Sequence, residues 1–152
     1  MIEVGAQGPD FNAPDDEGNR FSLSALRGSR VVVHFFALAW TGICASELMR
    51  LAELRTAIEA QGADVIGVSC DSRFTLSAWK QAMGNPLQLV SDFWPHGAIG
   101  RSYGVFDSEL GLNTRATFVI DEDGVVRSVF ASPKLSVARD LDVYVDALRR
   151  LG

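Results

Sequence analysis

The sequence predicts an α/β fold in which helices flank a central mixed sheet and a short hairpin comes first. Three observations carry this prediction. Val31–Phe36 and Ala63–Ser69 are apolar runs rich in valine, which is typical of strands buried on both faces. Between them, apolar residues from Leu48 onward recur at helical spacing. Later, Asp123-Gly124 separates two further apolar runs, which predicts an antiparallel hairpin.

Each expected element has a local reason. Turn residues separate the strands of the first hairpin, Gly28, Gly62 and Gly84 follow helical segments, and Asp71–Ser72 precedes a helix as a cap. The expected elements are a hairpin of Phe11–Ala13 and Arg20–Phe21, a helical turn at Ser22–Arg27, strands Val31–Phe36, Ala63–Ser69, Leu87–Val90, Thr117–Asp121 and Val125–Phe130, helices Ile43–Ala60 and Phe74–Met83, one more helical turn within Ser91–Tyr103, and a closing amphipathic helix through Leu141–Leu151.

A strand, a helix and a further strand in this order form a right-handed parallel unit, and the late hairpin adds antiparallel strands. This order is compatible with a thioredoxin-like fold. With 152 residues, of which 47% are hydrophobic and 22% charged, the chain is predicted to form a single domain over 1–152.

Composition also bounds the partners and the compartment. The net charge of −5 and the absence of a Lys/Arg run argue against nucleic acid or an anionic membrane as partners. No signal peptide and no membrane-length apolar run is visible, and two cysteines are too few for a disulfide framework. We therefore expect a cytoplasmic protein with reduced thiols.

Cys44 is the first candidate for chemistry. It lies where the buried strand Val31–Phe36 has ended and the helix Ile43–Ala60 begins. The first amides of a helix are unpaired and carry partial positive charge, so they favour an anion such as a thiolate. A helix N-terminus is one of the places where the pKa of a cysteine falls. The alternative is that Cys44 is a small buried apolar residue.

Thr41 stands three residues before Cys44, where thioredoxin-like proteins carry the first cysteine of Cys-x-x-Cys. A dithiol cycle within this motif is therefore impossible. What remains is one thiolate with a hydroxyl nearby, able to donate a hydrogen bond to sulfur or to a substrate oxygen.

The chain resembles the peroxiredoxins along nearly its whole length, and among them the AhpE-type one-cysteine peroxiredoxins. The matching motifs are Gly8-Pro9-Asp10-Phe11, Phe21-Ser22-Leu23 with Leu26-Arg27-Gly28, Phe35-Phe36 with Thr41-Gly42-Ile43-Cys44, Gly67-Val68-Ser69 with Asp71-Ser72, Ser91–Ala98, and Arg115-x-Thr117-Phe118-Val119-Ile120-Asp121. Arg115 taken alone is an arginine before a strand, and such residues are mostly exposed.

The resemblance implies roles for these residues. Cys44 is then the peroxidatic cysteine, which attacks a peroxide oxygen and becomes a sulfenic acid. Thr41 orients the peroxide, Arg115 holds the thiolate, and the amides of Ile43 and Cys44 complete a polar clamp. Glu47 is implied to orient the arginine. No metal and no cofactor is implied.

One residue departs from the family motif Pro-x-x-x-Thr-x-x-Cys. Its proline falls on Ala37, which is smaller and carries a backbone N–H. The proline normally shields the thiolate, so the substitution bears on rate and substrate more than on reaction class.

For the remaining candidate residues, structural roles are expected. Cys70 follows the strand Ala63–Ser69 at the same sheet edge as Cys44, so it is a candidate resolving cysteine, but a packed thiol is favoured. His34 is expected to pack within its strand, and His96 to shape a loop rather than bind metal. Trp40, Phe93, Trp94 and Phe106 are candidates for the core, and Trp40 also for a dimer surface.

Together these observations predict a thiol-dependent peroxidase for hydrogen peroxide or organic hydroperoxides, recycled by an external thiol. A homodimer built from loops near Cys44 is implied by the resemblance. The alternatives are a redox-sensing protein and a chaperone-like homologue whose peroxidase activity is reduced by Ala37.

Overall fold

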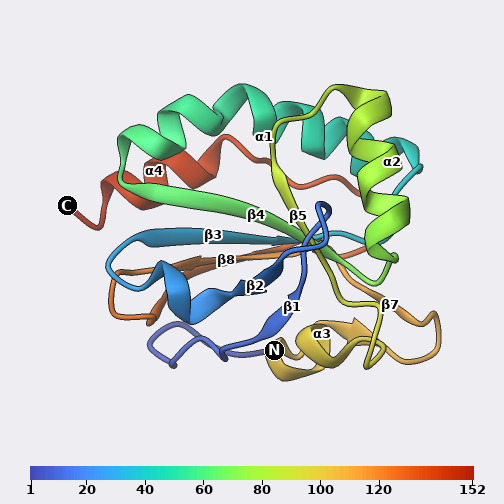
Figure 1. The fold of residues 1–152 in the computed structure, drawn as a ribbon. Coiled ribbons are helices and arrows are strands. Elements are labelled where there is room, and N and C mark those ends of the chain that lie inside the picture. Colours follow the sequence, from blue (N-terminus) through green and yellow to red (C-terminus); the bar gives the residue numbers. More distant parts are fainter.

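The computed structural model describes residues 1–152 and is built around a five-stranded sheet with the order β5-β4-β3-β8-β9 (Figure 1). The elements in chain order are β1 (Asn12–Pro14), β2 (Arg20–Ser22), a 3-10 turn (Leu23–Leu26), β3 (Arg30–Phe35), α1 (Gly42–Ala60), β4 (Ala63–Ser69), α2 (Arg73–Met83), β5 (Gln88–Ser91), α3 (Ala98–Tyr103), β6 (Phe106–Asp107), β7 (Leu112–Asn113), β8 (Ala116–Ile120), β9 (Val126–Ala131) and α4 (Val143–Arg149).

The sheet is mixed, as predicted. β3 pairs in parallel with β4, and β4 with β5, whereas β8 is antiparallel to both β3 and β9. β1 and β2 form a separate antiparallel hairpin. The predicted α/β fold with a central mixed sheet, flanking helices and an N-terminal hairpin is therefore confirmed.

Alternation along β3 divides the core into two layers because successive side chains of a strand point to opposite faces. Val32 and Phe36 pack on the face covered by α1, α2 and α4, whereas Val31, Val33 and Phe35 pack on the face covered by α3 and the hairpin (Figure 1). Every residue of β3 is buried, which explains the apolar residues along most of its length. Its two polar residues, Arg30 and His34, therefore need partners, and Arg30 finds them in Glu122 and the Leu148 carbonyl.

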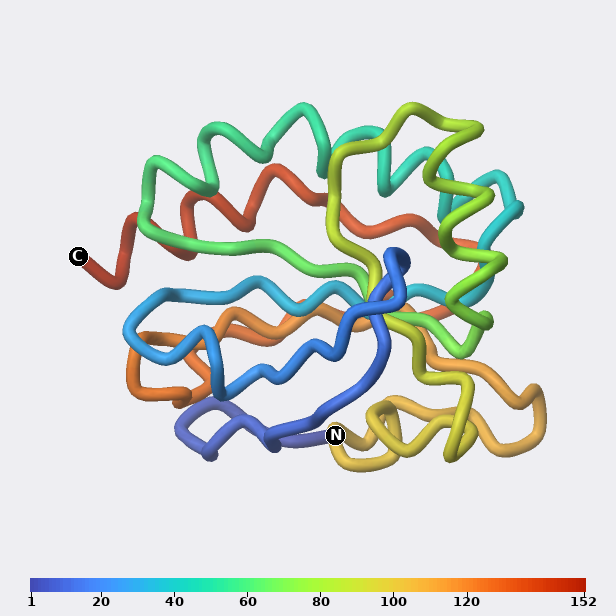
Figure 2. Tube along the Cα trace, viewed as in Figure 1, coloured from blue at the N-terminus to red at the C-terminus, as the bar shows by residue number.

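The segment before α4 places later residues beside the start of α1. Figure 2 shows this stretch of chain, between β9 and α4, crossing beneath α1 on the way to the C-terminus. Residues about 90 positions apart, such as Glu47 and Arg139, thereby come into contact. None of the helices is long and apolar enough to cross a membrane.

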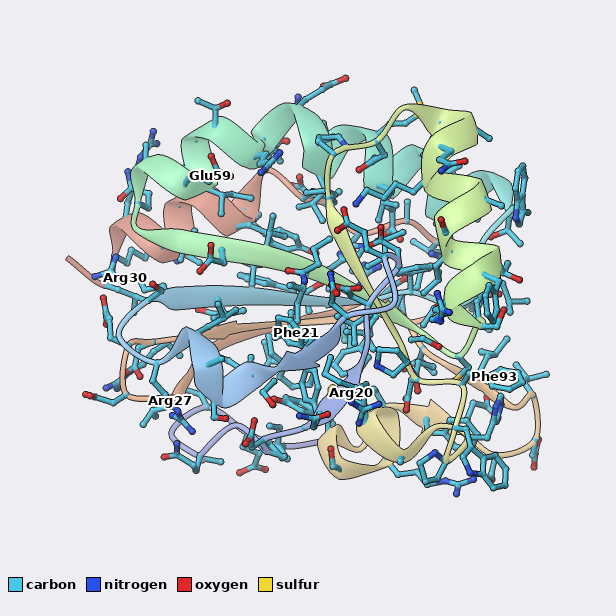
Figure 3. The ribbon with its side chains drawn as sticks, in the orientation of Figure 1. Arg20, Phe21, Arg27, Arg30, Glu59 and Phe93 are labelled. Atoms are coloured by element: carbon cyan, nitrogen blue, oxygen red, sulfur yellow. The ribbon has the colours of Figure 1, made fainter.

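Three expectations need correction. β6 and β7 form a small hairpin where the sequence predicts no strands, and α4 is shorter than the apolar spacing of Leu141–Leu151 indicates. Trp40, Phe93 and Trp94 are exposed rather than part of the core, and Phe93 lies at the edge of the molecule, far from Arg30 (Figure 3). Their apolar character alone did not distinguish surface from core.

Candidate active site

The loop between β3 and α1 carries the predicted motif and is fixed by Asp71. The Ala39 N–H donates to Asp71 Oδ2 at 2.8 Å, and the Ser69 hydroxyl donates to the same oxygen at 2.7 Å. Asp71 follows β4, the parallel neighbour of β3, so the two strand ends hold the loop between them. Thr41, two residues after Ala39 in this loop, is the N-cap residue of α1.

Cys44 lies in the first turn of α1 and is fully buried. The first helical hydrogen bond runs from the Ala45 N–H to the Thr41 carbonyl at 2.9 Å, so the amides of Ile43 and Cys44 have no carbonyl partner. These unpaired donors and the positive end of the helix lie at the cysteine. The local chain therefore places unpaired backbone donors beside a buried thiol.

Arg115 donates directly to the sulfur. Its Nη1 lies 3.2 Å from Cys44 Sγ and 2.7 Å from Glu47 Oε1, while its Nε donates to the Leu135 carbonyl at 2.7 Å. The side chain precedes β8 and is 96% buried, contrary to the usual exposure of arginine. Three fixed contacts leave the guanidinium one orientation, with a cationic edge on the sulfur.

Glu47 holds two arginines at once. Besides the bond from Arg115, it accepts from Arg139 through the backbone N–H and Nε at Oε2, both at 2.9 Å, and through Nη2 at Oε1 at 2.8 Å. Burial raises the pKa of the Glu47 carboxyl, but the hydrogen bonds and charges of Arg139 and Arg115 outweigh it and hold that pKa below its ordinary value. Glu47 is therefore the anion between two buried cations.

The structure places Thr41, Ala37 and Ile43 around the same helix start. The Thr41 hydroxyl donates to the Leu38 carbonyl at 2.7 Å, which leaves its oxygen free to accept. Ala37 is buried and packs in the same cluster as Cys44, and its N–H donates to no carbonyl or side chain. Trp40 has a φ of 66°, a left-handed conformation that costs a non-glycine residue about 1–2 kcal/mol.

Comparison with known proteins identifies the kind of chain. The model of the AhpC/TSA family matches residues 4–129 of this chain. The chain belongs to this family. It is 38% identical over 153 residues to "Alkyl hydroperoxide reductase E" of Mycobacterium tuberculosis, covering 99% of each chain.

Other relatives agree. The chain is 32% identical to "Peroxiredoxin-2" of Mus musculus, covering 97% of this chain and 76% of that protein. The crystal structure of "Peroxidoxin BcpB" from Mycobacterium tuberculosis superposes with a TM-score of 0.89 at 28% identity, over 100% of this chain and 99% of the other. The thioredoxin-like fold of the peroxiredoxins and a thiol-dependent peroxidase activity follow, and the sensor and chaperone alternatives are not favoured.

In this peroxiredoxin, Cys70 lies in a different environment from Cys44. It is buried at the end of β4, and burial together with the nearby carboxylates of Asp92 and Asp71 raises the pKa of its thiol to about 12. A thiol of that pKa is almost wholly protonated at neutral pH, so it is a poor nucleophile.

The two histidines have structural partners. Both ring nitrogens of His96 face backbone carbonyls, those of Phe93 at 3.1 Å and Gly111 at 2.7 Å, so it joins two loops. His34 is buried, and its Nε2 lies 3.0 Å from Arg139 Nη2.

Sequence reasoning missed Arg139 and Asp71 as parts of the site. Arg139 stands in an irregular stretch with no periodic signal, 92 residues from its partner Glu47. The sequence predicts Asp71 as part of a helix cap and of a family motif but gives it no role in the site, and it is Ser72 that caps the helix by accepting from the Thr75 N–H. The one available signal was the polar cluster after β4, since the ends of neighbouring parallel strands meet at one edge of the sheet.

Proposed function

We propose that this chain reduces hydroperoxides at Cys44 by a one-cysteine mechanism. The observation that carries the proposal is the 3.2 Å bond from Arg115 Nη1 to Cys44 Sγ at the start of α1. The Cys44 thiolate attacks one peroxide oxygen, a sulfur–oxygen bond forms and the oxygen–oxygen bond breaks. Cys44 becomes a sulfenic acid, and the other oxygen leaves as water or an alcohol after taking up a proton.

The neighbouring groups serve this step in distinct ways. Arg115 stabilises the thiolate and the negative charge that develops on the peroxide oxygens, and the free amides of Ile43 and Cys44 add donors that need no rearrangement. The Thr41 oxygen accepts the peroxide O–H, because its own proton is engaged with Leu38. Glu47 fixes Arg115, and buried Ala37 keeps water from the sulfur.

Recycling uses an external thiol. One thiol displaces water from the sulfenic acid to give a mixed disulfide, and a second thiol releases Cys44, so the two electrons come from outside the chain. Cys70 is not assigned as the resolving residue because its thiol is buried and protonated. The substrates are hydrogen peroxide or organic hydroperoxides, and neither metal nor cofactor is required.

The setting we propose is a cytoplasmic homodimer of one domain spanning 1–152, without nucleic acid or membrane as partner. Exposed Leu38 and Trp40 lie in the loop before α1 and are candidates for the dimer surface. The net charge of −5 supports the exclusion of polyanionic partners.

The decisive experiment measures peroxide consumption with excess small thiol for the wild type, Cys44→Ser and Cys70→Ser. We expect Cys44→Ser to lose consumption entirely and Cys70→Ser to keep nearly all of it. Peroxide turnover that survives in folded Cys44→Ser would refute the assignment of the reacting sulfur.

A further inference from the structure

His34 is a buried titratable group that the reaction described above does not use. It lies in the middle of β3, fully buried, on the face of the sheet that packs against α1 and α4. Across the sheet it stands opposite Thr117 of β8, and its ring lies edge-on to Tyr144 of α4 with 6.4 Å between ring centroids. A polar ring in an otherwise apolar strand costs stability unless its nitrogens are satisfied.

The partners of the ring determine where its proton lies. Arg139 Nη2 is 3.0 Å from His34 Nε2, and a guanidinium nitrogen only donates. Nε2 must therefore be the acceptor, so the neutral ring carries its proton on Nδ1. That nitrogen faces the Thr117 oxygen at 3.5 Å.

The same reasoning orders the next hydrogen bonds. Thr117 Oγ1 accepts from Arg139 Nη1 at 3.0 Å, so its own proton is free to point to the Tyr144 hydroxyl. If the ring were protonated on both nitrogens, the Nε2–H of His34 would point at an N–H of Arg139. The arrangement is consistent only with neutral His34.

A continuous set of contacts leads from His34 to the reacting sulfur. His34 and Thr117 hold one edge of the Arg139 guanidinium, whose Nε and Nη2 bind Glu47. Glu47 in turn binds Arg115 Nη1, the nitrogen that donates to Cys44 Sγ. All these side chains are at least nine-tenths buried.

We propose that neutral His34 is a positioning residue for the peroxidase reaction, acting as the acceptor that fixes Arg139 and, through Glu47, the guanidinium of Arg115 on Cys44. The proposal rests on the peroxidase function proposed above. His34 touches neither the sulfur nor the peroxide.

The charges around the ring agree with this role. His34 faces Arg139 and Arg115 as cations, Glu47 as the anion that they share, and the neutral hydroxyls of Thr117 and Tyr144. Burial, then Arg139, then Arg115 hold the pKa of the His34 imidazole well below its ordinary value. The ring therefore stays an acceptor throughout the neutral range.

The test compares His34→Phe with His34→Gln. Phenylalanine keeps a planar ring without nitrogens, whereas glutamine offers one acceptor and N–H donors. We measure the second-order rate of Cys44 oxidation by hydrogen peroxide, from stopped-flow fluorescence, together with the thermal midpoint of each protein. We expect His34→Phe to be slower by about tenfold, the scale of one hydrogen bond to a charged group, and His34→Gln to stay close to the wild type.

A second comparison checks the route through Arg139. In an Arg139→Lys background the single ammonium no longer spans both Glu47 and His34, so we expect His34→Phe to cost little more there. If His34→Phe does not fold, His34→Val replaces it, since valine suits a buried strand.

The outcomes separate this proposal from the one on which it rests. A wild type that does not oxidise Cys44 with peroxide would refute the proposed function. An active wild type with an equally fast His34→Phe would overturn only the role of His34. Equal losses in His34→Phe and His34→Gln would overturn it as well, because the acceptor would then not matter.

Discussion

Cys44 and Cys70 are both buried thiols that follow parallel strands of one sheet, yet the charged groups nearest to their sulfurs have opposite signs. Cys44 lies at a helix start with free amides and receives a hydrogen bond from Arg115. At Cys70, burial together with the nearby carboxylates of Asp92 and Asp71 raises the pKa of the thiol to about 12. Burial alone therefore does not decide whether a cysteine is reactive. The charge and the donors that burial brings to the sulfur decide it.

The largest expected difference between the two thiols is in oxidation by one equivalent of peroxide. With a pKa of about 12, only about one Cys70 thiol in ten thousand is ionised at pH 8. We expect a sulfenic-acid trap such as dimedone to label Cys44 and leave Cys70 unlabelled, as mapped by peptide mass spectrometry. Excess peroxide should carry Cys44 on to sulfinic acid.

An internal disulfide is the outcome that would contradict this comparison. Loss of two hydrogens from the intact mass of the wild type, absent in Cys70→Ser, would make Cys70 the resolving residue despite its environment.

The arginines near the two thiols offer a matched pair of variants. Arg115→Ala removes the donor on Cys44, and we expect the oxidation rate to fall by about 10²-fold, as when one preorganised donor is lost. Arg101→Ala removes a cation near Cys70 that stacks on Phe106, 4.3 Å from its ring centroid, and should leave the rate unchanged. Stopped-flow oxidation of both variants tests this, and equal rates for the two would remove Arg115 from the site.

The sequence was informative wherever a local pattern encodes the structure. The apolar runs located β3 and β4 to within a residue, and the switch to helical spacing placed Cys44 in the first turn of α1. Arg115 and Glu47 were predicted only through the family resemblance, because nothing in an arginine before a strand indicates that it is buried.

The rest depended on tertiary contacts. Arg139, His34 and Thr117 come from a loop and two strands, and their hydrogen bonds span 22 to 105 residues of sequence. No periodicity links them. The exposed Trp40 and Trp94 show the converse, since an aromatic residue predicts burial only when its neighbours supply a face to pack against.

A smaller effect is expected from acid, which should lower the folding stability of the protein through His34. Its pKa in the folded protein is below the ordinary value of 6.5, so the unfolded chain binds the proton more readily. The contribution of neutral His34 to the free energy of unfolding is therefore fully present above about pH 6.5. It is lost as the pH falls below that value, by at most about 1.4 kcal/mol per pH unit for one group. Thermal midpoints measured from about pH 7.5 to about pH 5 should fall less in His34→Phe than in the wild type. Parallel curves for the two proteins would contradict the buried neutral ring.

The smallest effect is expected at Ala37, where this chain departs from its family. Proline lacks the backbone N–H, but the Ala37 N–H donates to no carbonyl or side chain, so Ala37→Pro breaks no hydrogen bond within the chain. Ala37 is buried in the cluster that includes Cys44, and the larger ring would shield the sulfur further. Proline also restricts the unfolded chain, which stabilises a protein by about 0.4–1 kcal/mol where the conformation is compatible. We therefore expect equal or higher peroxide rates and a thermal midpoint that is unchanged or slightly raised. A large loss of rate in a folded variant would mean that the free N–H of Ala37 itself serves the reaction. The site around Cys44 would then depend on alanine at this position.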